Sequence, residues 1–202
     1  MNLKWSISAY LATVPTLGIR YFLISQFILV AAIFPLTAGI SGGQGVLEIR
    51  VKDHREAIGD FDKLILTIEA ILISPKPGLK FWQTRWKSLD PTTKSFDLTK
   101  YVGAESVRIF QGALDPGKFD AVNLKLKKTS GLLKKSGGDA PIKNLLGPIR
   151  LPFEVRAQGE TQIVLDLVVL DMSDHPPQGY ELAVRGYELY TNGKLVDRVP
   201  PG

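Results

Sequence analysis

The chain has 202 residues, with 25 lysines and arginines against 20 aspartates and glutamates, two histidines and no cysteine. The lack of cysteine excludes disulfide bonds, thiol catalysis and lipid attachment through an N-terminal cysteine. With His54 and His175 as its two histidines, any nucleophile–base pair would have to use one of these or a lysine.

A run of 20 uncharged residues, Tyr21–Ile40, is long enough to cross a membrane as a helix. Basic residues precede it (Lys4 and Arg20), which predicts a cytoplasmic N-terminus and an extracytoplasmic remainder: periplasmic, lumenal or at the cell surface. Two interpretations stay open, an uncleaved anchor and a cleaved signal peptide whose apolar stretch is Phe22–Leu36. A Gly-rich tether follows, so residues 1–44 form the leader.

From residue 45 onward the patterns indicate strands. In Gly45–Asp53, Leu47, Ile49 and Val51 alternate with charged residues, as in a half-buried strand. Phe61–Ser74 is longer and more apolar, which indicates a central strand. We expect further strands at 80–89 and 105–111, and a short strand or a turn of helix at 94–102.

The second half continues the same way. Asp115-Pro116-Gly117 predicts a type II turn, with Gly117 at the position that needs positive φ. Further strands are expected at 118–128, 149–155, 161–171 and 179–190, with a Gly/Ser/Lys-rich loop at 129–147 and a tail at 193–202. The chain therefore predicts an all-β fold: a single antiparallel Greek-key-type β-sandwich over residues 45–192, after one N-terminal helix.

The order of motifs resembles a known family. Gly45-x-Leu47-x-Ile49-x-Val51-x-Asp53, Leu114-x-Pro116-Gly117-Lys118-Phe119, Leu151-Pro152, Leu165-Asp166 and Gly179-Tyr180-x-Leu182 together resemble the domain of unknown function numbered 4382. The resemblance implies a secreted, transthyretin-like or carbohydrate-binding-like β-sandwich, often lipid-anchored, with no established catalytic residues. This chain lacks the anchor cysteine, so attachment would have to use Tyr21–Ile40.

Acidic residues and histidine occur together in two predicted loops. Asp53 and His54 follow the first strand, while Asp171 and His175 follow the penultimate one. Carboxylates with imidazole could hold a divalent cation if both loops lie at one end of the sandwich. The alternative is that these residues cap backbone N–H groups in ordinary turns.

Asp166 lies inside the apolar segment Val164–Leu170, which predicts burial. A buried carboxylate needs a partner, and we expect a loop backbone N–H or an arginine.

Two surfaces are candidates for binding. Trp82 and Trp86 would share one strand face and could form a platform for a glycan or a partner protein, or belong to the core. The lysines Lys125, Lys127, Lys134 and Lys135 belong to a basic stretch that suits anionic lipid headgroups or an acidic partner, or is simply solvated. Nucleic acid is not expected as a partner of an exported domain.

The sequence thus favours a non-catalytic, membrane-tethered or secreted module that binds an envelope or membrane-complex partner, or a glycan. One alternative is a metal-dependent or hydrolytic enzyme that uses the Asp53/His54 and Asp171/His175 loops. Another is a stable accessory subunit of a transmembrane assembly. No cofactor is expected beyond the divalent cation of the enzyme alternative.

Overall fold

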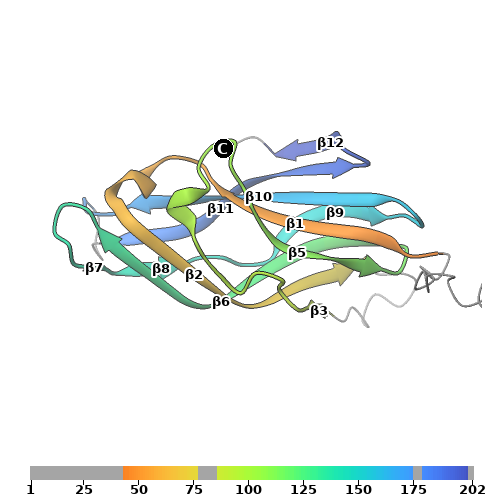
Figure 1. The fold of residues 1–202 in the computed structure, drawn as a ribbon, viewed down its shortest axis with the longest axis horizontal. Helices are drawn as coiled ribbons and strands as arrows, with labels where there is room; N and C mark the ends of the chain where they lie inside the picture. The colour runs from red at the N-terminus through yellow and green to blue at the C-terminus, as the bar shows by residue number, and fades with distance from the viewer. Residues whose placement is uncertain (1–42, 77–85, 175–178, 200–202) are drawn as a thin grey trace, which may run out of the picture. The chain divides into compact units, whose positions relative to one another are not determined.

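A computed structural model describes residues 43–76, 86–174 and 179–199. They form an all-β domain of two sheets, which confirms the predicted class (Figure 1). Tyr21–Ile40, Trp82 and His175 lie outside the described residues. Within the described ranges, no helix is long and apolar enough to cross a membrane.

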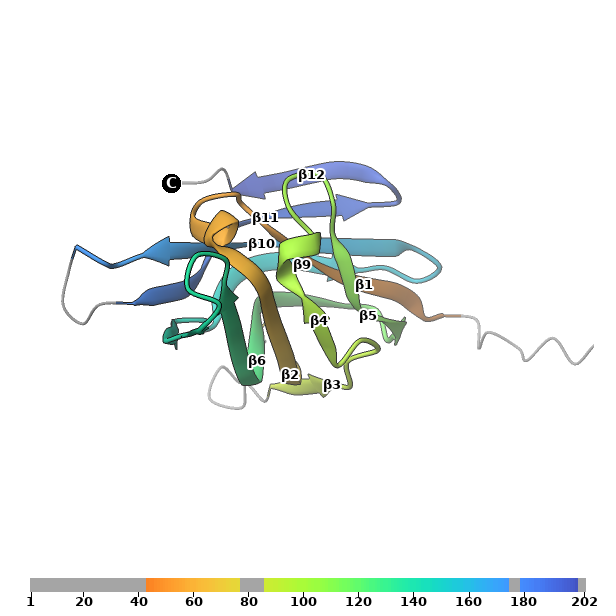
Figure 2. The same cartoon turned by 60° about the vertical axis from the view of Figure 1, so that its left-hand side comes forward.

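Sheet A has the strand order β12-β11-β10-β1-β5, with β8 paired to β11. Its strands are β1 (Gly45–Asp53), β5 (Val107–Leu114), β8 (Ile142–Asn144), β10 (Glu160–Asp171), β11 (Tyr180–Thr191) and β12 (Lys194–Val199). The expectation of antiparallel sheets is wrong here, because β1 runs parallel to β10 and β8 runs parallel to β11. Sheet A is therefore mixed, and it curls into a half-barrel between β12 and β5 (Figure 2).

Sheet B has the order β3-β2-β6-β7, with β4 paired to β2 and β9 paired to β6. Its strands are β2 (Phe61–Pro75), β3 (Lys87–Leu89), β4 (Ser95–Asp97), β6 (Gly117–Leu133), β7 (Asp139–Ala140) and β9 (Ile149–Val155). Two short 3₁₀ turns, η1 (Ala57–Asp60) and η3 (Leu98–Lys100), cover one end of the core.

The core lies between the sheets and follows the predicted alternation. Leu47, Ile49 and Val51 of β1 are fully buried, and so are Leu64, Leu66, Ile71 and Ile73 of β2. β10 is different because Val164 and Val168, which are not part of this core cluster, are buried as well. Both faces of β10 are thus shielded from water, which explains its nearly continuous apolar sequence.

Three expectations about local structure are corrected. Gly117 is not among the described glycines with positive φ, so the turn before β6 is not of type II. Residues 129–147 are not one loop, because β6 continues to Leu133 and is followed by β7 and β8. Residues 193–202 are not only a tail, because Lys194–Val199 form the edge strand β12.

Candidate functional site

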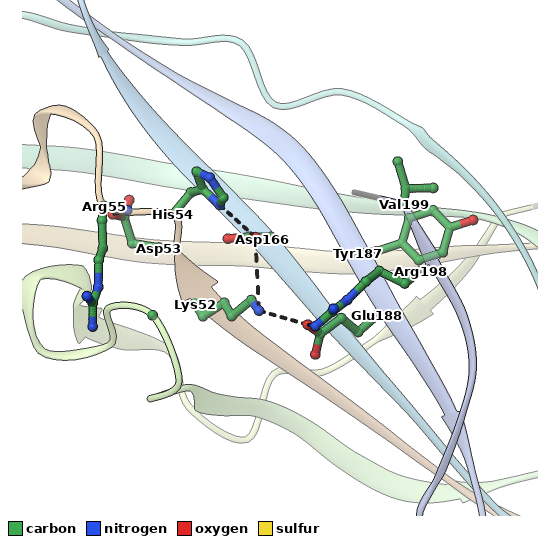
Figure 3. Close-up of a pocket in the computed structure, with 10 residues that line it drawn as sticks. Lys52, Asp53, His54, Arg55, Asp166, Tyr187, Glu188, Arg198 and Val199 are labelled. Atoms are coloured by element: carbon green, nitrogen blue, oxygen red, sulfur yellow. Dashed lines mark hydrogen bonds and ion pairs between the residues drawn. The ribbon is translucent and has the colours of Figure 1, made fainter. Parts of the chain in front are cut away.

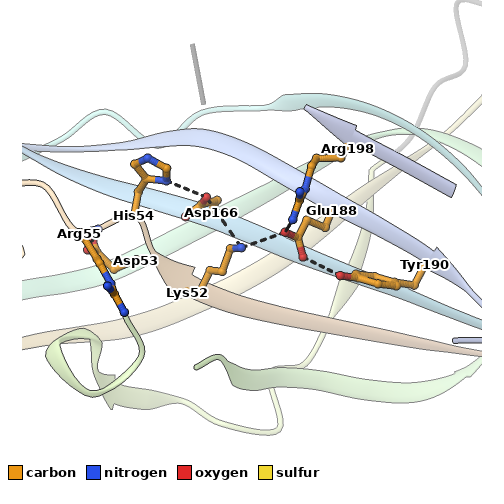
Figure 4. Close-up of polar contacts among 8 residues, drawn as sticks. All are labelled: Lys52, Asp53, His54, Arg55, Asp166, Glu188, Tyr190 and Arg198. Carbon is orange, nitrogen blue, oxygen red and sulfur yellow. Dashed lines mark hydrogen bonds and ion pairs between the residues drawn. The ribbon is translucent and has the colours of Figure 1, made fainter. Parts of the chain in front are cut away.

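The outer face of sheet A carries charged side chains at positions where a sheet packed on both sides would be apolar. Lys52 on β1 is in register with Asp166 on β10, and Glu188 on β11 is in register with Arg198 on β12. Paired residues in a sheet point to the same face, so these four side chains converge (Figure 4). The sequence builds this face from the charged half of the β1 alternation and from Asp166, the one charged residue between the acidic end residues of β10, Glu160 and Asp171.

Glu188 is the centre of the network. Its carboxylate accepts hydrogen bonds from Lys52 Nζ at 3.0 Å, from the Tyr190 hydroxyl at 2.7 Å and from Arg198. Burial alone would raise the pKa of Glu188, but these donors outweigh it and lower the pKa to about 2. Glu188 is therefore an anion that organises the two cations beside it.

Asp166 is buried, as the sequence predicts, but its partner is neither an arginine nor the backbone. Its Oδ2 atom lies 3.1 Å from His54 Nδ1 and 4.0 Å from Lys52 Nζ. Its Oδ1 atom is buried without a hydrogen-bond partner. The partners come from β1 and from the residue that follows it, because the parallel β1–β10 pairing brings residues 52–54 alongside Asp166.

Further along the same face, Glu48 holds a second group of cations. It accepts from Arg50 at 2.8 Å, from Arg108 at 3.1 Å and from Gln162 at 3.2 Å. Burial raises the pKa of Glu48, but the hydrogen bond from Arg50 and the charges of both arginines outweigh it, so the pKa is lowered overall. Two groups of paired acids and bases therefore lie along this face.

Asp53 shapes the turn that leaves β1. Its Oδ1 atom accepts a hydrogen bond from the Arg55 backbone N–H at 2.8 Å, while its Oδ2 atom is buried without a partner. Arg55 has φ 77°, a left-handed conformation that is uncommon outside glycine. Burial raises the pKa of Asp53 to about 6. A strained arginine at the rim of a polar surface is typical of a binding position.

These residues surround a hollow of about 370 Å³ (Figure 3). It is lined by Lys52, Asp53, His54, Arg55, Gly103, Asp166, Tyr187, Glu188, Arg198 and Val199. A second hollow of about 560 Å³ continues from it toward Arg50 and Gln162, and the two share Lys52, Gly103, Glu188 and Arg198. Volumes of this size suit a small polar ligand or one residue of a larger one.

The structure brings two of the four predicted metal ligands into this hollow, Asp53 and His54. Asp171 lies at the same end of sheet A, but Asp53 is in register with Leu167, so Asp171 is about 13 Å further along β10. The capping role is confirmed for Asp53, and also for Asp171, which accepts from the Ser173 N–H at 2.9 Å. No group of three acids or histidines among the described residues is placed to hold a metal ion.

The described residues of the other predicted surfaces do not line the hollow. Trp86 is 40% exposed just before β3; the platform with Trp82 stays a prediction. Lys125 and Lys127 are exposed on β6 of sheet B, and neither forms an ion pair with another described residue. Lys134 donates to the Gly59 carbonyl at 2.9 Å, and Lys135 is exposed in the following turn.

Sequence reasoning missed Lys52, Glu188, Tyr190 and Arg198. Lys52 belongs to the charged half of the β1 alternation, which is the half expected to face away from the core, and Arg198 lies in the segment expected to be a tail. The one available signal was Asp166: a lone acid in an apolar strand needs a basic partner on a neighbouring strand.

The fold and the hollow define a two-sheet all-β domain with a polar recess on the outer face of its mixed sheet. The chain belongs to the family described as Domain of unknown function (DUF4382), whose model matches residues 44–183. No curated protein matches the chain, and no solved structure matches it.

Proposed function

We propose that the protein is a non-catalytic binding module that works outside the cytoplasm, anchored by Tyr21–Ile40 or released after its cleavage. Its ligand, carried by an envelope or membrane-complex partner or by a glycan, binds in the hollow on the outer face of sheet A. The observation that carries the proposal is this hollow, with charged side chains from β1, β10, β11 and β12 around it.

Stability does not account for this arrangement. Buried ion pairs often contribute less to stability than apolar side chains of the same size, because each charge loses its hydration. Asp166 and Asp53 each have an unpartnered buried oxygen, and Arg55 has a left-handed backbone. A surface with three such unfavourable features is better explained by recognition than by folding.

The test of this proposal is photo-crosslinking from the rim of the hollow in cells that naturally produce the full chain. Val199 lines the hollow and is 42% exposed, so it can be replaced by a photoreactive amino acid. We expect a crosslinked product from position 199, lost when Lys52→Met is added, and none from position 125 on sheet B. A product that persists with Lys52→Met, or none above the position-125 control, contradicts the proposal.

A second candidate function, hydrolysis, is favoured by the contact between His54 and Asp166. A carboxylate that orients an imidazole is part of many acid–base sites. However, no hydroxyl group among the described residues hydrogen-bonds His54. Release of nitrophenol from simple esters and phosphodiesters by the wild type, abolished by His54→Gln, would favour this function over binding alone.

A further inference from the structure

We infer that the hollow binds its ligand through an oxyanion, meaning a carboxylate, phosphate or sulfate group, held at the guanidinium of Arg55 (Figure 3). This inference rests on the proposed function and adds the chemical class of the ligand. It follows from the inventory of hydrogen-bond donors and acceptors that remain unused at the hollow.

The unused donors are exposed. Arg55 makes no side-chain hydrogen bond or ion pair with any described residue, although its guanidinium lines the hollow. Arg198 is 56% exposed at its side chain and uses one nitrogen on Glu188. Lys52 uses one of three donors on Glu188, at 3.0 Å, with Asp166 a further neighbour at 4.0 Å.

The unused acceptors are hidden. Asp166 Oδ1 and Asp53 Oδ2 have almost no contact with solvent, so they offer nothing to a ligand that arrives from the open side. The Glu188 carboxylate is already surrounded by three donors. A ligand in the hollow therefore meets N–H groups and needs acceptor oxygens of its own.

The pairing of the charges agrees with this inventory. The hollow is lined by three cations, Lys52, Arg55 and Arg198, and by three carboxylates, Asp53, Asp166 and Glu188. Lys52 and Arg198 share Glu188 as their anion, which leaves Arg55 as the lining cation without a charged partner among the described residues. No group of three acids or histidines among the described residues is placed to hold a metal ion, so a metal cation is disfavoured as the ligand.

The backbone of Arg55 is also fixed before any ligand arrives. Asp53 fixes its backbone, and Gly103 leaves room for its side chain, because a Cβ at Gly103 would lie 2.7 Å from an Arg55 guanidinium nitrogen. The Gly103 N–H in turn donates to the Asp53 carbonyl at 3.0 Å. The Arg55 guanidinium therefore packs against Gly103 with its N–H groups unused, and a guanidinium binds oxyanions in a two-pronged geometry.

The test is calorimetric titration of the full chain in nanodiscs of zwitterionic lipid, at constant ionic strength, with sodium phosphate in one arm and sodium glucuronate in the other. We expect saturable binding of at least one of the two anions. The anion that binds more tightly shows whether the site prefers a phosphate or a carboxylate. Arg55→Asn should weaken binding by about tenfold or more, because asparagine accepts the left-handed backbone but removes the guanidinium. The affinity of Arg55→Lys should lie between those of the wild type and Arg55→Asn.

Arg150→Asn is the matched control, because Arg150 is an exposed arginine on β9 outside the hollow. It should leave binding unchanged. The inference is overturned if neither probe binds the wild type, or if Arg55→Asn binds as the wild type does. If either of these results is found while position 199 still crosslinks in the chain that retains Lys52, the proposed function stands and only the oxyanion is wrong. If position 199 gives no crosslink in that chain either, both the proposed function and the oxyanion inference are contradicted.

Discussion

Asp53, Asp166 and Glu188 share one recess and differ in how completely they are paired. Glu188 has three donors, Asp166 has a histidine and a distant lysine, and Asp53 has a single backbone N–H. The best-paired and the least-paired of these carboxylates differ in pKa. Donors hold the pKa of Glu188 at about 2, and burial raises the pKa of Asp53 to about 6. The two residues therefore affect stability in opposite directions as pH changes.

Asp53→Asn should stabilise the fold at alkaline pH. Because the folded pKa is raised from 3.8 to about 6, the contribution of Asp53 is fully present below pH 3.8 and lost as pH rises through 6. Asparagine resembles the protonated acid at every pH. We expect the free energy of unfolding in urea to exceed that of the wild type by on the order of 2 kcal/mol at pH 8, and the two to converge at pH 4.

The control is Asp171→Asn, an exposed residue with the same capping role, for which little change is expected at either pH. A wild type more stable than Asp53→Asn at pH 8 would show that the ionised carboxylate has a stabilising partner after all.

Glu188→Gln should destabilise the fold at neutral pH. The depressed pKa means that the contribution of Glu188 is present above pH 4.5 and lost as pH falls through about 2. Removing the carboxylate leaves Lys52 and Arg198 without their anion, and we expect a loss of about 1–2 kcal/mol at pH 7. Thermal unfolding at pH 7 and pH 3 measures it, and the difference between variant and wild type should shrink at pH 3.

Glu154→Gln removes an exposed carboxylate that is 42% accessible and paired with Arg156, so it should change stability little. Equal melting temperatures for Glu188→Gln and the wild type at pH 7 would mean that the network on the outer face is not formed.

At the scale of elements, the sequence was informative where periodicity decided the structure. The range Gly45–Asp53 and the range 149–155 are strands with the predicted bounds, because alternating burial defines a half-buried strand. It was uninformative about partners: alternation does not encode that β1 pairs with β10, more than 100 residues away, or that the pairing is parallel. Asp166 could therefore be predicted as buried, while Lys52 and His54 could not be predicted as its partners.

β6 shows why the segment 129–133 was expected to be a loop although it is part of a strand. Lys125, Lys127 and Lys128 interrupt its apolar pattern, and the polar residues after them resembled a loop. The strand continues because its pairing with β2 shifts register near Ile68, so polar residues fall on the exposed face. Gly131 then faces the core, beside Phe61 and Ile142.

Gly131→Ala should destabilise the fold. A Cβ at this position would lie 2.5 Å from Phe61 Cε1 and 2.7 Å from Ile142 Cδ1, so β6 and its neighbours would have to move. We expect a loss of about 1–3 kcal/mol in urea unfolding. Gly147→Ala is the control, because a Cβ there meets no atom within 4 Å. A neutral Gly131→Ala would mean that residues 129–133 do not pack on the core as a strand.

For the whole molecule, residues 41–202 form one compact unit, and the described part has its own core between two sheets. Among the described residues, every buried apolar residue of this cluster lies between Leu47 and Leu189. We therefore predict that the leader delivers the domain and does not complete its core.

Residues 43–202 should accordingly fold without residues 1–42. We expect a soluble protein with a β-type circular dichroism spectrum and one cooperative unfolding transition, because a core of this size supports independent folding. The full chain in detergent should unfold at the same temperature when monitored by the same β signal. A truncated chain that is helical, aggregated or without a transition would show that the leader contributes to the fold, and an accessory subunit built around that leader would then be favoured over a tethered module.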